Sequence, residues 1–400
     1  MFSSRLDFDL SQNRLSRLLA ELRTAGTGVL DLTESNPTRA GFSYPDAEIL
    51  TSLAEPGSLL YSPEPTGSST AREAIAAHYA AKGLRVRADS VVLTTSTSES
   101  YAYILKLLAD PGHEILVPRP SYPLFEYLAA LESVRIVQYP LIYTGEWSID
   151  FQVLERAASE RARAVILVNP NNPTGSFLKQ HELEKLIALA RSHDLAIVSD
   201  EVFADYSFSS DRHRVASLVE VKDTLTFCLS GLSKVSGLPQ MKLGWMVVSG
   251  PEAQRREALH RLEWIADTYL SVSTPVQHAA PALLAAGKSV RAQIHKRSGM
   301  NLEFLRTAVN GTPCHLLHVE GGWYATIQVP RTRTEEEWTL DLLRKQSVLV
   351  QPGYFYDFES EAFLVLSLLT PEDVFREGVG RIVSEVGEAD WPLPHGRGSE

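Results

Sequence analysis

Residues 229–245, LSGLSKVSGLPQMKLGW, place two lysines, Lys234 and Lys242, between two apolar runs. The run TLTFCL (224–229) precedes the lysines and the run LGWMVV (243–248) follows them, and both have the composition of buried strands. A lysine close to the end of a buried strand is costly unless it is solvated, paired or used in chemistry. The stretch therefore indicates a functional site at the end of a strand.

Seven short runs of valine, isoleucine and leucine indicate the main sheet. Each run ends in polar residues, proline or glycine, and several alternate with amphipathic helical patterns such as residues 181–193. Apolar strands that alternate with helices are typical of an α/β fold with a mainly parallel sheet sandwiched by helices. The seven expected strands lie within residues 90–95, 113–118, 133–140, 163–170, 195–203, 225–230 and 243–249.

The alternation changes past about residue 285, where helices become longer and strands fewer. This change predicts a large domain over residues 51–284 and a smaller α+β domain. The smaller domain takes residues 285–386 and part of an N-terminal arm, residues 1–50. Residues 387–400 contain proline, glycine and charge without periodicity, so we expect a disordered tail.

The bulk composition narrows the class of protein. The 400 residues carry 38 Lys and Arg against 49 Asp and Glu and contain no basic run, which argues against a nucleic-acid partner. No apolar stretch reaches the ~20 residues of a membrane helix, and the first residues are too polar for a signal peptide. Cys228 and Cys314 are the only cysteines and lack metal-ligand spacing, so we expect a cytoplasmic protein without a bound metal.

The residues that follow the expected strands share one rim, because the carboxyl ends of parallel strands meet at one edge of a sheet. In open α/β sheets, ligands bind beyond that edge. The residues at this rim supply hydroxyls, an aromatic ring, an amide, a carboxylate and an amine, and they are Ser96, Thr97, Ser98, Tyr122, Asn172, Asp200 and Lys234. This set of groups suits a small, flat, phosphorylated ligand that carries an aldehyde.

Several motifs, in order along the chain, resemble those of the pyridoxal-phosphate-dependent aminotransferases of fold type I, class I/II. They are YSPEPTGSSTAREAIAAHY (61–79), PSYP (120–123), NPNNPTG (169–175), SDEVF (199–203), GLSK (231–234) and MKLGW (241–245). The resemblance extends from DLTESNPT (31–38) to FLVLSLLTPEDVF (363–375). It implies fold type I, pyridoxal 5′-phosphate as the cofactor, and transfer of an amino group between an amino acid or amine and a 2-oxo acid.

The resemblance assigns a role to each residue around the cofactor ring. Lys234 would be the Schiff-base lysine, whose amine attacks the aldehyde and later carries a proton between the substrate carbon and the cofactor. Asp200 would keep the pyridine nitrogen protonated, so that the ring accepts electrons. Asn172 would hydrogen-bond the ring hydroxyl, and Tyr122 would stack on the ring.

The resemblance also places the phosphate group at the rim, near the start of the helix that follows Ser96. Hydroxyl and backbone N–H groups of residues 96–98 would hold it there. Ser233 and Lys242 would complete this phosphate site. Tyr61 would reach it from the partner subunit of a homodimer with shared active sites.

Four residues depart from the usual pattern of the family. Lys242 replaces an arginine and loses its bidentate fork, Phe203 replaces a tyrosine that bonds the ring oxygen, and Thr97 replaces a glycine. Val365 takes the place of the arginine that clamps the substrate α-carboxylate. Because such a contact contributes several kcal/mol, another group must replace it, or the substrate presents no carboxylate there.

Arg39, at the expected entrance of the site, is the candidate that would bind the carboxylate in place of the missing arginine. The resemblance also assigns Asn36, in the same ESNPT segment, to substrate binding. An exposed arginine without a role is an equally open interpretation of Arg39. A substrate without an α-carboxylate, such as a primary amine or an ω-amino acid, is the alternative.

The sequence leaves one alternative to amino transfer open and argues against another. A decarboxylase or lyase on the same fold breaks a different substrate bond, and because carboxylate placement decides which bond breaks, Val365 leaves this alternative open. AAGKS (285–289) resembles part of a phosphate loop, but Ala282 occupies the position of its first glycine, and no G-x-G-x-x-G follows a strand. We therefore expect no nucleotide site.

Overall fold

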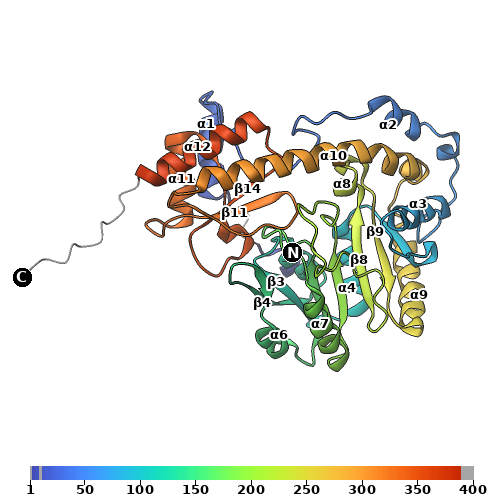
Figure 1. Cartoon of the computed structure of the whole chain (residues 1–400). Coiled ribbons are helices and arrows are strands. Elements are labelled where there is room, and N and C mark those ends of the chain that lie inside the picture. The colour runs from blue at the N-terminus through green and yellow to red at the C-terminus, as the bar shows by residue number, and fades with distance from the viewer. Residues whose placement is uncertain (1, 9–10, 389–400) are drawn as a thin grey trace, which may run out of the picture.

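The structure is a computed structural model that describes residues 2–8 and 11–388. Its main feature is an eight-stranded sheet with the strand order β2-β9-β8-β7-β6-β3-β4-β5 (Figure 1). In chain order these strands are β2 (Val91–Thr94), β3 (Glu114–Arg119), β4 (Arg135–Tyr143), β5 (Trp147–Ile149), β6 (Ala162–Val168), β7 (Ala196–Asp200), β8 (Thr226–Gly231) and β9 (Gly244–Ser249).

The strand directions confirm the predicted mainly parallel sheet. Strands β4, β3, β6, β7 and β8 are parallel to one another. Strand β9 runs antiparallel to both of its neighbours, and β5 runs antiparallel to β4. All seven strands expected from the sequence are present, and the structure adds β5 as an eighth. Its three residues are too few to show a period of two, so the sequence pattern does not reveal it.

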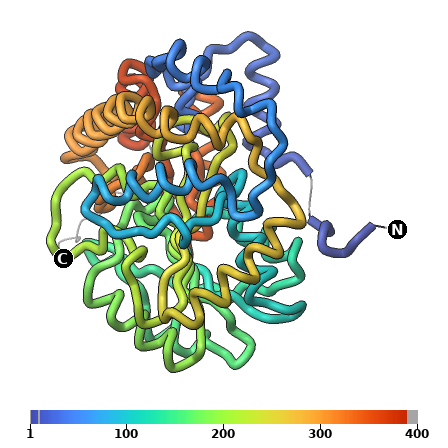
Figure 2. Tube along the Cα trace, turned by 90° about the vertical axis from the view of Figure 1, so that its right-hand side faces the viewer, coloured from blue at the N-terminus to red at the C-terminus, as the bar shows by residue number. Residues whose placement is uncertain are grey.

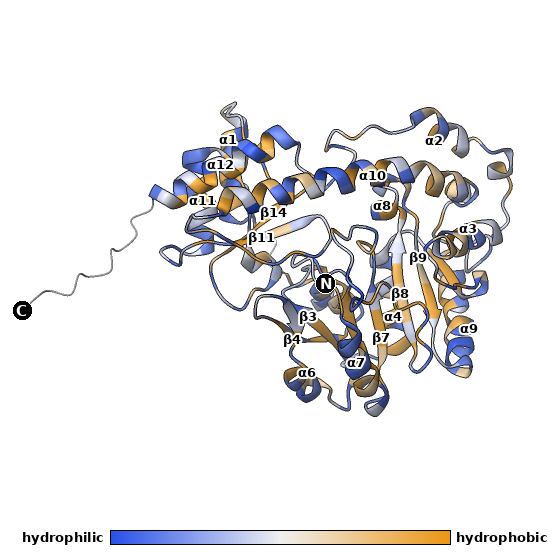
Figure 3. Ribbon diagram, viewed as in Figure 1, coloured by the Kyte–Doolittle hydropathy of each residue, from blue (hydrophilic) through white to orange (hydrophobic). Residues whose placement is uncertain are grey.

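Two apolar cores lie on the two faces of this sheet, because successive residues of a strand point to opposite faces. Leu116 and Ile197 enter one core, whereas Ile115 and Val198 enter the other. Helices α4 (Thr97–Leu108), α5 (Leu124–Leu131) and α9 (Glu252–Tyr269) cover the second core. The first core is covered by α3 (Ser69–Ala80), α6 (Phe151–Ala157), α7 (Gln180–Ser192) and α8 (Leu232–Val235). Figure 3 shows the apolar colour concentrated on β7, β8 and β9.

A smaller unit surrounds a four-stranded antiparallel sheet with the order β10-β11-β14-β13. Its strands are β10 (His315–Leu316), β11 (Tyr324–Gln328), β13 (Gln351–Pro352) and β14 (Phe363–Ser367). Helices α1 (Arg14–Thr24), α11 (Glu335–Gln346) and α12 (Glu372–Glu388) belong to the same unit. The parallel pair β1 (Leu30–Asp31) and β12 (Val348–Leu349) joins the N-terminal segment to it.

The long helix α10 (Thr274–Val309) connects the two units. Its first part packs against α2 (Asp46–Leu53), α3 and α8, and its later part packs against α12. Figures 1 and 2 show this helix running along the top of the molecule, beside the N-terminal segment that carries α2. The domain limits at residues 50 and 284 stay predictions, since α10 continues through the second of them without a break.

The structure also tests the expectations for residues 285–289 and for the C-terminal tail. AAGKS (285–289) lies inside α10 and is helical, so it forms no phosphate loop. Residues 387 and 388 of the expected tail end α12, and the remainder of 387–400 lies outside the described residues. Within residues 2–8 and 11–388, none of the helices combines the length and the apolarity that crossing a membrane requires.

Candidate active site

A cavity of about 320 Å³ lies at the carboxyl ends of the parallel strands, where the sequence predicts a site. Nine of the predicted site residues line it, from five segments of the chain: Ser96, Thr97, Ser98, Tyr122, Asn172, Asp200, Phe203, Ser233 and Lys234. The other lining residues are Ser35, Tyr101, Leu124, Phe125, Val168, Val202, Gly231, Pro239, Gly244 and Tyr324. Among these described residues, Lys234 is the one basic side chain and Asp200 the one carboxylate.

Lys234 projects from α8, a helix of four residues that follows β8 directly. The hydroxyl of Tyr206 donates to the Lys234 carbonyl oxygen at 2.6 Å, and the hydroxyl of Tyr44 donates to that of Gly237 at 2.8 Å. These bonds fix the end of the short helix. Removal from water lowers the pKa of Lys234 to about 8, and the nearby carboxylate of Asp200 offsets part of this shift. Near pH 8 much of the amine is therefore neutral, the form that attacks an aldehyde.

Asp200 is the last residue of β7. The Tyr101 hydroxyl donates to its Oδ2 at 3.1 Å, and the Val202 N–H donates to its Oδ1 at 3.2 Å. Removal from water raises the pKa of Asp200 to about 6, although both hydrogen bonds and Lys234 act in the opposite direction. A carboxylate in this position is stabilised by a cationic ligand.

The first turn of α4 forms one end of the cavity. Ser96 is its N-cap and accepts from the Glu99 N–H at 3.3 Å, while the Glu99 carboxylate accepts from the Thr95 N–H at 2.7 Å. The N–H groups at the start of a helix lack partners within the helix and carry a partial positive charge. This end of the cavity therefore favours an anion.

One glycine lets the start of α4 approach the sheet, and a second lets the ends of β8 and β9 lie close together. A Cβ atom at Gly244, the first residue of β9, would lie 2.9 Å from the carbonyl carbon of Ser96. A Cβ atom at Gly231 would lie 3.1 Å from the Gly244 Cα. Because both glycines line the cavity, side chains there would fill its floor or displace the helix start.

Asn172 and Tyr122 stand on loops that follow β6 and β3. Asn172 is 8% exposed, and its Oδ1 has no hydrogen-bond partner among the described residues. A buried polar atom without a partner, on the wall of a cavity, points to a ligand that supplies the partner. Tyr122 is 47% exposed and lines the same cavity, so its ring is open to solvent as well as to a ligand.

Five predicted residues do not line the cavity: Tyr61, Lys242, Arg39, Asn36 and Val365. Lys242 follows the 3-10 turn Pro239–Met241 in the left-handed conformation, with φ of 51°, and is exposed. This chain alone therefore does not place the Lys242 side chain at the anion end, since the residue is exposed and does not line the cavity. Tyr61 is exposed outside the cavity, where a single chain does not test a contact with a partner subunit.

The residues expected to contact the substrate lie farther out. Asn36 accepts hydrogen bonds from the N–H and the hydroxyl of Thr38 and so fixes the loop that carries Arg39, which is exposed. Val365 is buried in β14, opposite Thr326 of β11. Two residues along, Ser367 pairs with Tyr324, which lines the cavity. Val365 thus shares a sheet face with a cavity residue without reaching the cavity itself.

The sequence patterns do not identify three aromatic residues of the site. Tyr101 follows Thr97 by four residues and so shares its helix face, a signal that could have revealed the bond to Asp200. Tyr206 and Trp323 meet Lys234 through contacts between distant segments, which no local pattern encodes. The Trp323 ring centroid lies 4.5 Å from Lys234 Nζ.

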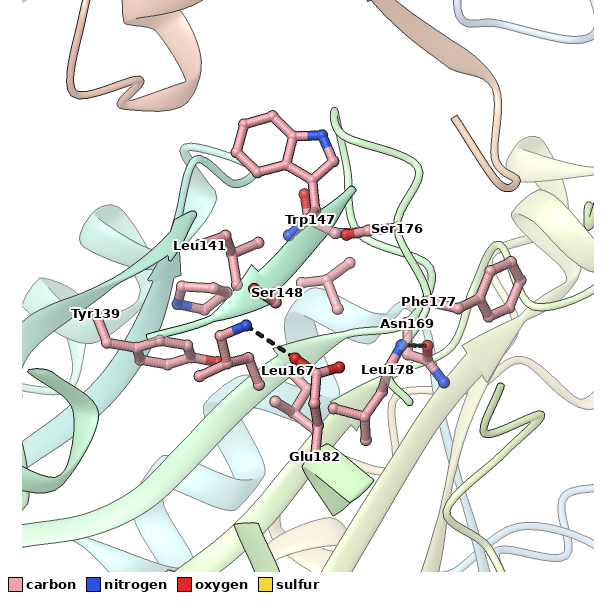
Figure 4. A pocket seen from close by; sticks show the side chains of 14 residues that line it. Tyr139, Leu141, Trp147, Ser148, Leu167, Asn169, Ser176, Phe177, Leu178 and Glu182 are labelled. Carbon is pink, nitrogen blue, oxygen red and sulfur yellow. Dashed lines mark hydrogen bonds between the residues drawn. The ribbon is translucent and has the colours of Figure 1, made fainter. Parts of the chain in front are cut away.

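A second cavity, beside the loop that carries Asn172, does not fit a cofactor. Figure 4 shows its side chains, with Trp147 and Ser176 on one side and Glu182 on the other. Its volume of about 30 Å³ holds about one water molecule. Glu182 accepts hydrogen bonds from the N–H groups of Ile149 and Lys179, both at 2.9 Å. This cavity belongs to the packing beneath β5.

Comparison with known proteins identifies the family. The family described as "Aminotransferase class I and II" matches residues 27–382. The chain belongs to the class I and II aminotransferases. The chain is 28% identical over 368 residues to glutamate-pyruvate aminotransferase AlaA of Escherichia coli, covering 88% of this chain and 89% of that protein. It is 29% identical over 367 residues to alanine aminotransferase of Mycobacterium tuberculosis, covering 88% and 83%.

Solved structures agree with this assignment. An alanine aminotransferase from Pyrococcus furiosus superposes with a TM-score of 0.87 at 25% identity, over 96% of this chain and 99% of that chain. An aminotransferase from Escherichia coli superposes with a TM-score of 0.83 at 25% identity, over 97% and 98%. The expectations of fold type I and of a transaminase are thereby confirmed. The family supports transamination and gives no support to a decarboxylase.

The cofactor of this aminotransferase family is pyridoxal 5′-phosphate, as the sequence predicts. The cavity fits it chemically, since it offers a partly neutral amine, a carboxylate that a cation stabilises, a helix start that favours an anion and an unpartnered amide oxygen. The two glycines supply a floor that any Cβ would obstruct.

Proposed function

We propose that this aminotransferase transfers the amino group of an α-amino acid, with alanine and glutamate as the first candidates, to a 2-oxo acid, and that Lys234 carries the cofactor. The observation that supports it most is the meeting of Lys234, Asp200, Asn172 and the start of α4 in one cavity. The choice of amino acids is supported by relatives named glutamate-pyruvate aminotransferase and alanine aminotransferase.

When bound, pyridoxal 5′-phosphate supplies an aldehyde that takes up amino groups and a ring that accepts electrons. In its neutral form, Lys234 Nζ would hold the cofactor through the aldehyde, and as a free amine it would accept a proton from the substrate Cα. Asp200 would hold the positive ring nitrogen, and the Tyr101 hydroxyl, which donates to this carboxylate, fixes its orientation. The exposed ring of Tyr122 would stack on the cofactor ring, and the Asn172 side chain would hydrogen-bond the ring hydroxyl.

The opposite end of the cavity binds the phosphate in this proposal. The first-turn N–H groups of α4 and the hydroxyls of residues 96–98 hold it, together with the Ser233 hydroxyl. Because Lys242 is exposed and does not line the cavity, Lys234 is the one basic side chain among the described residues that line it. The phosphate is then held by hydroxyls and N–H groups of this chain.

The substrate carboxylate needs a cation, and the one basic side chain among the described residues of the cavity wall, Lys234, is assigned to the cofactor. Ser35 lines the cavity, and Arg39 lies four residues farther along the same loop, exposed and without an ion pair among the described residues. We assign the carboxylate to Arg39 because of this position and because its charge is unpaired within the described part of the chain. Val365, to which the resemblance assigns the usual place of the arginine, is buried and apolar.

An absorbance experiment tests this function. Alanine and glutamate, added to the purified holoenzyme, should convert its cofactor to pyridoxamine phosphate, and pyruvate or 2-oxoglutarate should reverse the change. Arg39→Ala should raise the KM for amino acids at least tenfold and leave the cofactor spectrum unchanged. Arg17→Ala, on the exposed side of α1, is the control. It should change neither the KM for amino acids nor the cofactor spectrum. Conversion by simple amines as fast as by amino acids would contradict the proposed substrate class.

We also propose a homodimer in the cytoplasm. Leu59, Leu60 and Tyr61 form an exposed apolar segment, and Tyr61 and Leu270 line the same surface hollow. Contiguous exposed apolar residues are typical of a subunit interface. The cytoplasmic location is supported by Cys228 and Cys314, which are both buried and unpaired.

A further inference from the structure

The amine of Lys234 lies against aromatic rings. Its Nζ is 4.5 Å from the ring centroid of Trp323 and 5.4 Å from that of Phe203. Within the described residues this amine has no ion pair and no hydrogen bond. The faces of the two rings are therefore the groups that hold it, and an indole face attracts a cation more strongly than a phenyl face does.

Trp323 is fixed on several sides. Its side chain is fully buried, and the rings of Phe203 and Tyr206 contact it edge to face, with centroid distances of 5.3 and 5.1 Å. Its carbonyl accepts from the Leu368 N–H at 2.7 Å, and the preceding Gly322 N–H donates to the Tyr206 carbonyl at 2.9 Å. The indole is therefore a rigid surface, whereas the lysine chain is flexible.

A buried ion network ties the segment before Trp323 to the large sheet. The Glu320 carboxylate accepts hydrogen bonds from Lys179 Nζ, from Arg214 Nε at 2.8 Å and from the Phe177 N–H at 3.0 Å. Glu320 belongs to the smaller unit, and its three partners belong to loops that follow β6 and β7. The position of the indole above the amine is thus determined by contacts between the two units.

We propose that Trp323 is the seat of the Lys234 ammonium group whenever this amine is not joined to the cofactor. The role rests on the assignment of Lys234 as the cofactor lysine. In each transfer the amine is released and must stay close to the reacting carbon. An ion pair with Asp200 would hold the amine too, but it would occupy the carboxylate that the ring nitrogen needs. An aromatic seat holds the cation and leaves Asp200 free.

The charged groups around the seat are few. From β7, Asp200 is the carboxylate whose field reaches the amine. From α10, Arg291 directs its guanidinium to the Val235 carbonyl at 3.4 Å and pairs with Asp205 at 3.5 Å. The Tyr206 hydroxyl bonds the Lys234 backbone and not its amine. A change at Trp323 therefore alters the aromatic contact of the amine and leaves these charges in place.

The test measures the ionisation of Lys234 in the cofactor-free protein. Trace acetylation across a pH series, read by mass spectrometry of the Lys234 peptide, gives the pH midpoint of this amine. Because the ring face favours the ammonium form, Trp323→Leu should lower the midpoint by about 0.5 to 1 pH unit, and Trp323→Phe by less. A midpoint that is unchanged or raised in both variants would overturn the proposal.

Trp338→Phe is the matched control. Trp338 is also fully buried and also carries a cation over its ring, Arg333 at 4.6 Å, but it lies on α11 away from the cavity. This control should leave the Lys234 midpoint unchanged. Thermal melting shows whether Trp323→Leu folds. If it does not, the test uses Trp323→Phe alone. A lowered Lys234 midpoint in that variant supports the proposal, and an unchanged midpoint overturns it. Failure of the proposed function would give another result: the wild-type protein would not bind the cofactor covalently at Lys234.

Discussion

Lys234 and Asp200 share a cavity in which removal from water moves both pKa values toward neutrality. The pKa of the lysine falls to about 8 and that of the aspartate rises to about 6. Both shifts mean that burial destabilises the ionised form of each group. A bound cofactor would relieve this, because its aldehyde bonds the neutral amine and its ring nitrogen places a cation beside the carboxylate. The identities of the two residues follow from their motifs, but these shifts depend on burial, which the sequence does not show.

The lowered pKa of Lys234 predicts how cofactor capture depends on pH. At pH 7 a lysine with a pKa of about 8 has roughly 300 times more neutral amine than one with an unshifted pKa of about 10.5. The capture rate of pyridoxal phosphate by cofactor-free protein should therefore rise about tenfold per pH unit below pH 8 and level off above it. Stopped-flow absorbance measures this rate, with Lys234→Arg as the control that shows no covalent capture. A rate that keeps rising to about pH 10 would show that the amine is not desolvated.

At the scale of elements, strand ends were the most predictable feature. The apolar runs predict seven strands of the main sheet, and because parallel strands end at one rim, seven of the site residues could be placed together from the sequence pattern. The family resemblance added Phe203 and Ser233, which line the same cavity. The turn that carries Lys242 was not predictable, since a residue other than glycine adopts the left-handed backbone there, with φ of 51°. The packing of Trp323 on Lys234 was not predictable either, because it joins segments about ninety residues apart in different units.

Gly244 is the element-scale position that is most sensitive to substitution. Gly244→Ala would place a Cβ atom 2.9 Å from the Ser96 backbone, so the start of α4 must move. We expect a loss of about 1–3 kcal/mol in the free energy of unfolding. We also expect an at least tenfold weaker affinity for pyridoxal phosphate, since the displaced helix start holds the phosphate. Chemical denaturation and equilibrium binding measure the two effects.

Gly299→Ala is the control for this substitution. Gly299 lies inside α10, and a Cβ atom there would meet nothing within 4 Å. Alanine should therefore stabilise the helix by up to about 1 kcal/mol and leave cofactor affinity unchanged. Equal cofactor affinity in the Gly244→Ala variant and the wild type would show that the α4 start does not hold the phosphate.

At the scale of the whole molecule, the apolar segment Leu59 to Tyr61 is exposed to solvent in the single chain. The side chains of Leu59 and Leu60 are 93% and 68% exposed, and Tyr269 and Leu270 are also exposed close to the hollow that Tyr61 lines. The dimer was suggested by the family resemblance and not by a local pattern. The single chain adds the surface that such an interface would bury.

Light scattering of the purified protein tests the dimer. We expect a mass of twice the 44.3 kDa chain, and Leu60→Glu should shift the protein toward the single-chain mass because a charge replaces a buried apolar contact. Met300→Glu, an exposed position on α10 away from this segment, should leave the dimer intact. A wild-type protein with the mass of one chain would contradict the shared active site.

The central claim is that Lys234 carries the cofactor at the carboxyl edge of the parallel strands. The most direct measurement is reduction of the holoenzyme with borohydride, which fixes the cofactor to its lysine, followed by mass spectrometry of the peptides. We expect the mass of reduced pyridoxal phosphate on the peptide that contains Lys234, and no fixed cofactor in the Lys234→Ala protein. A fixed cofactor on Lys242 or on any other lysine would contradict the site.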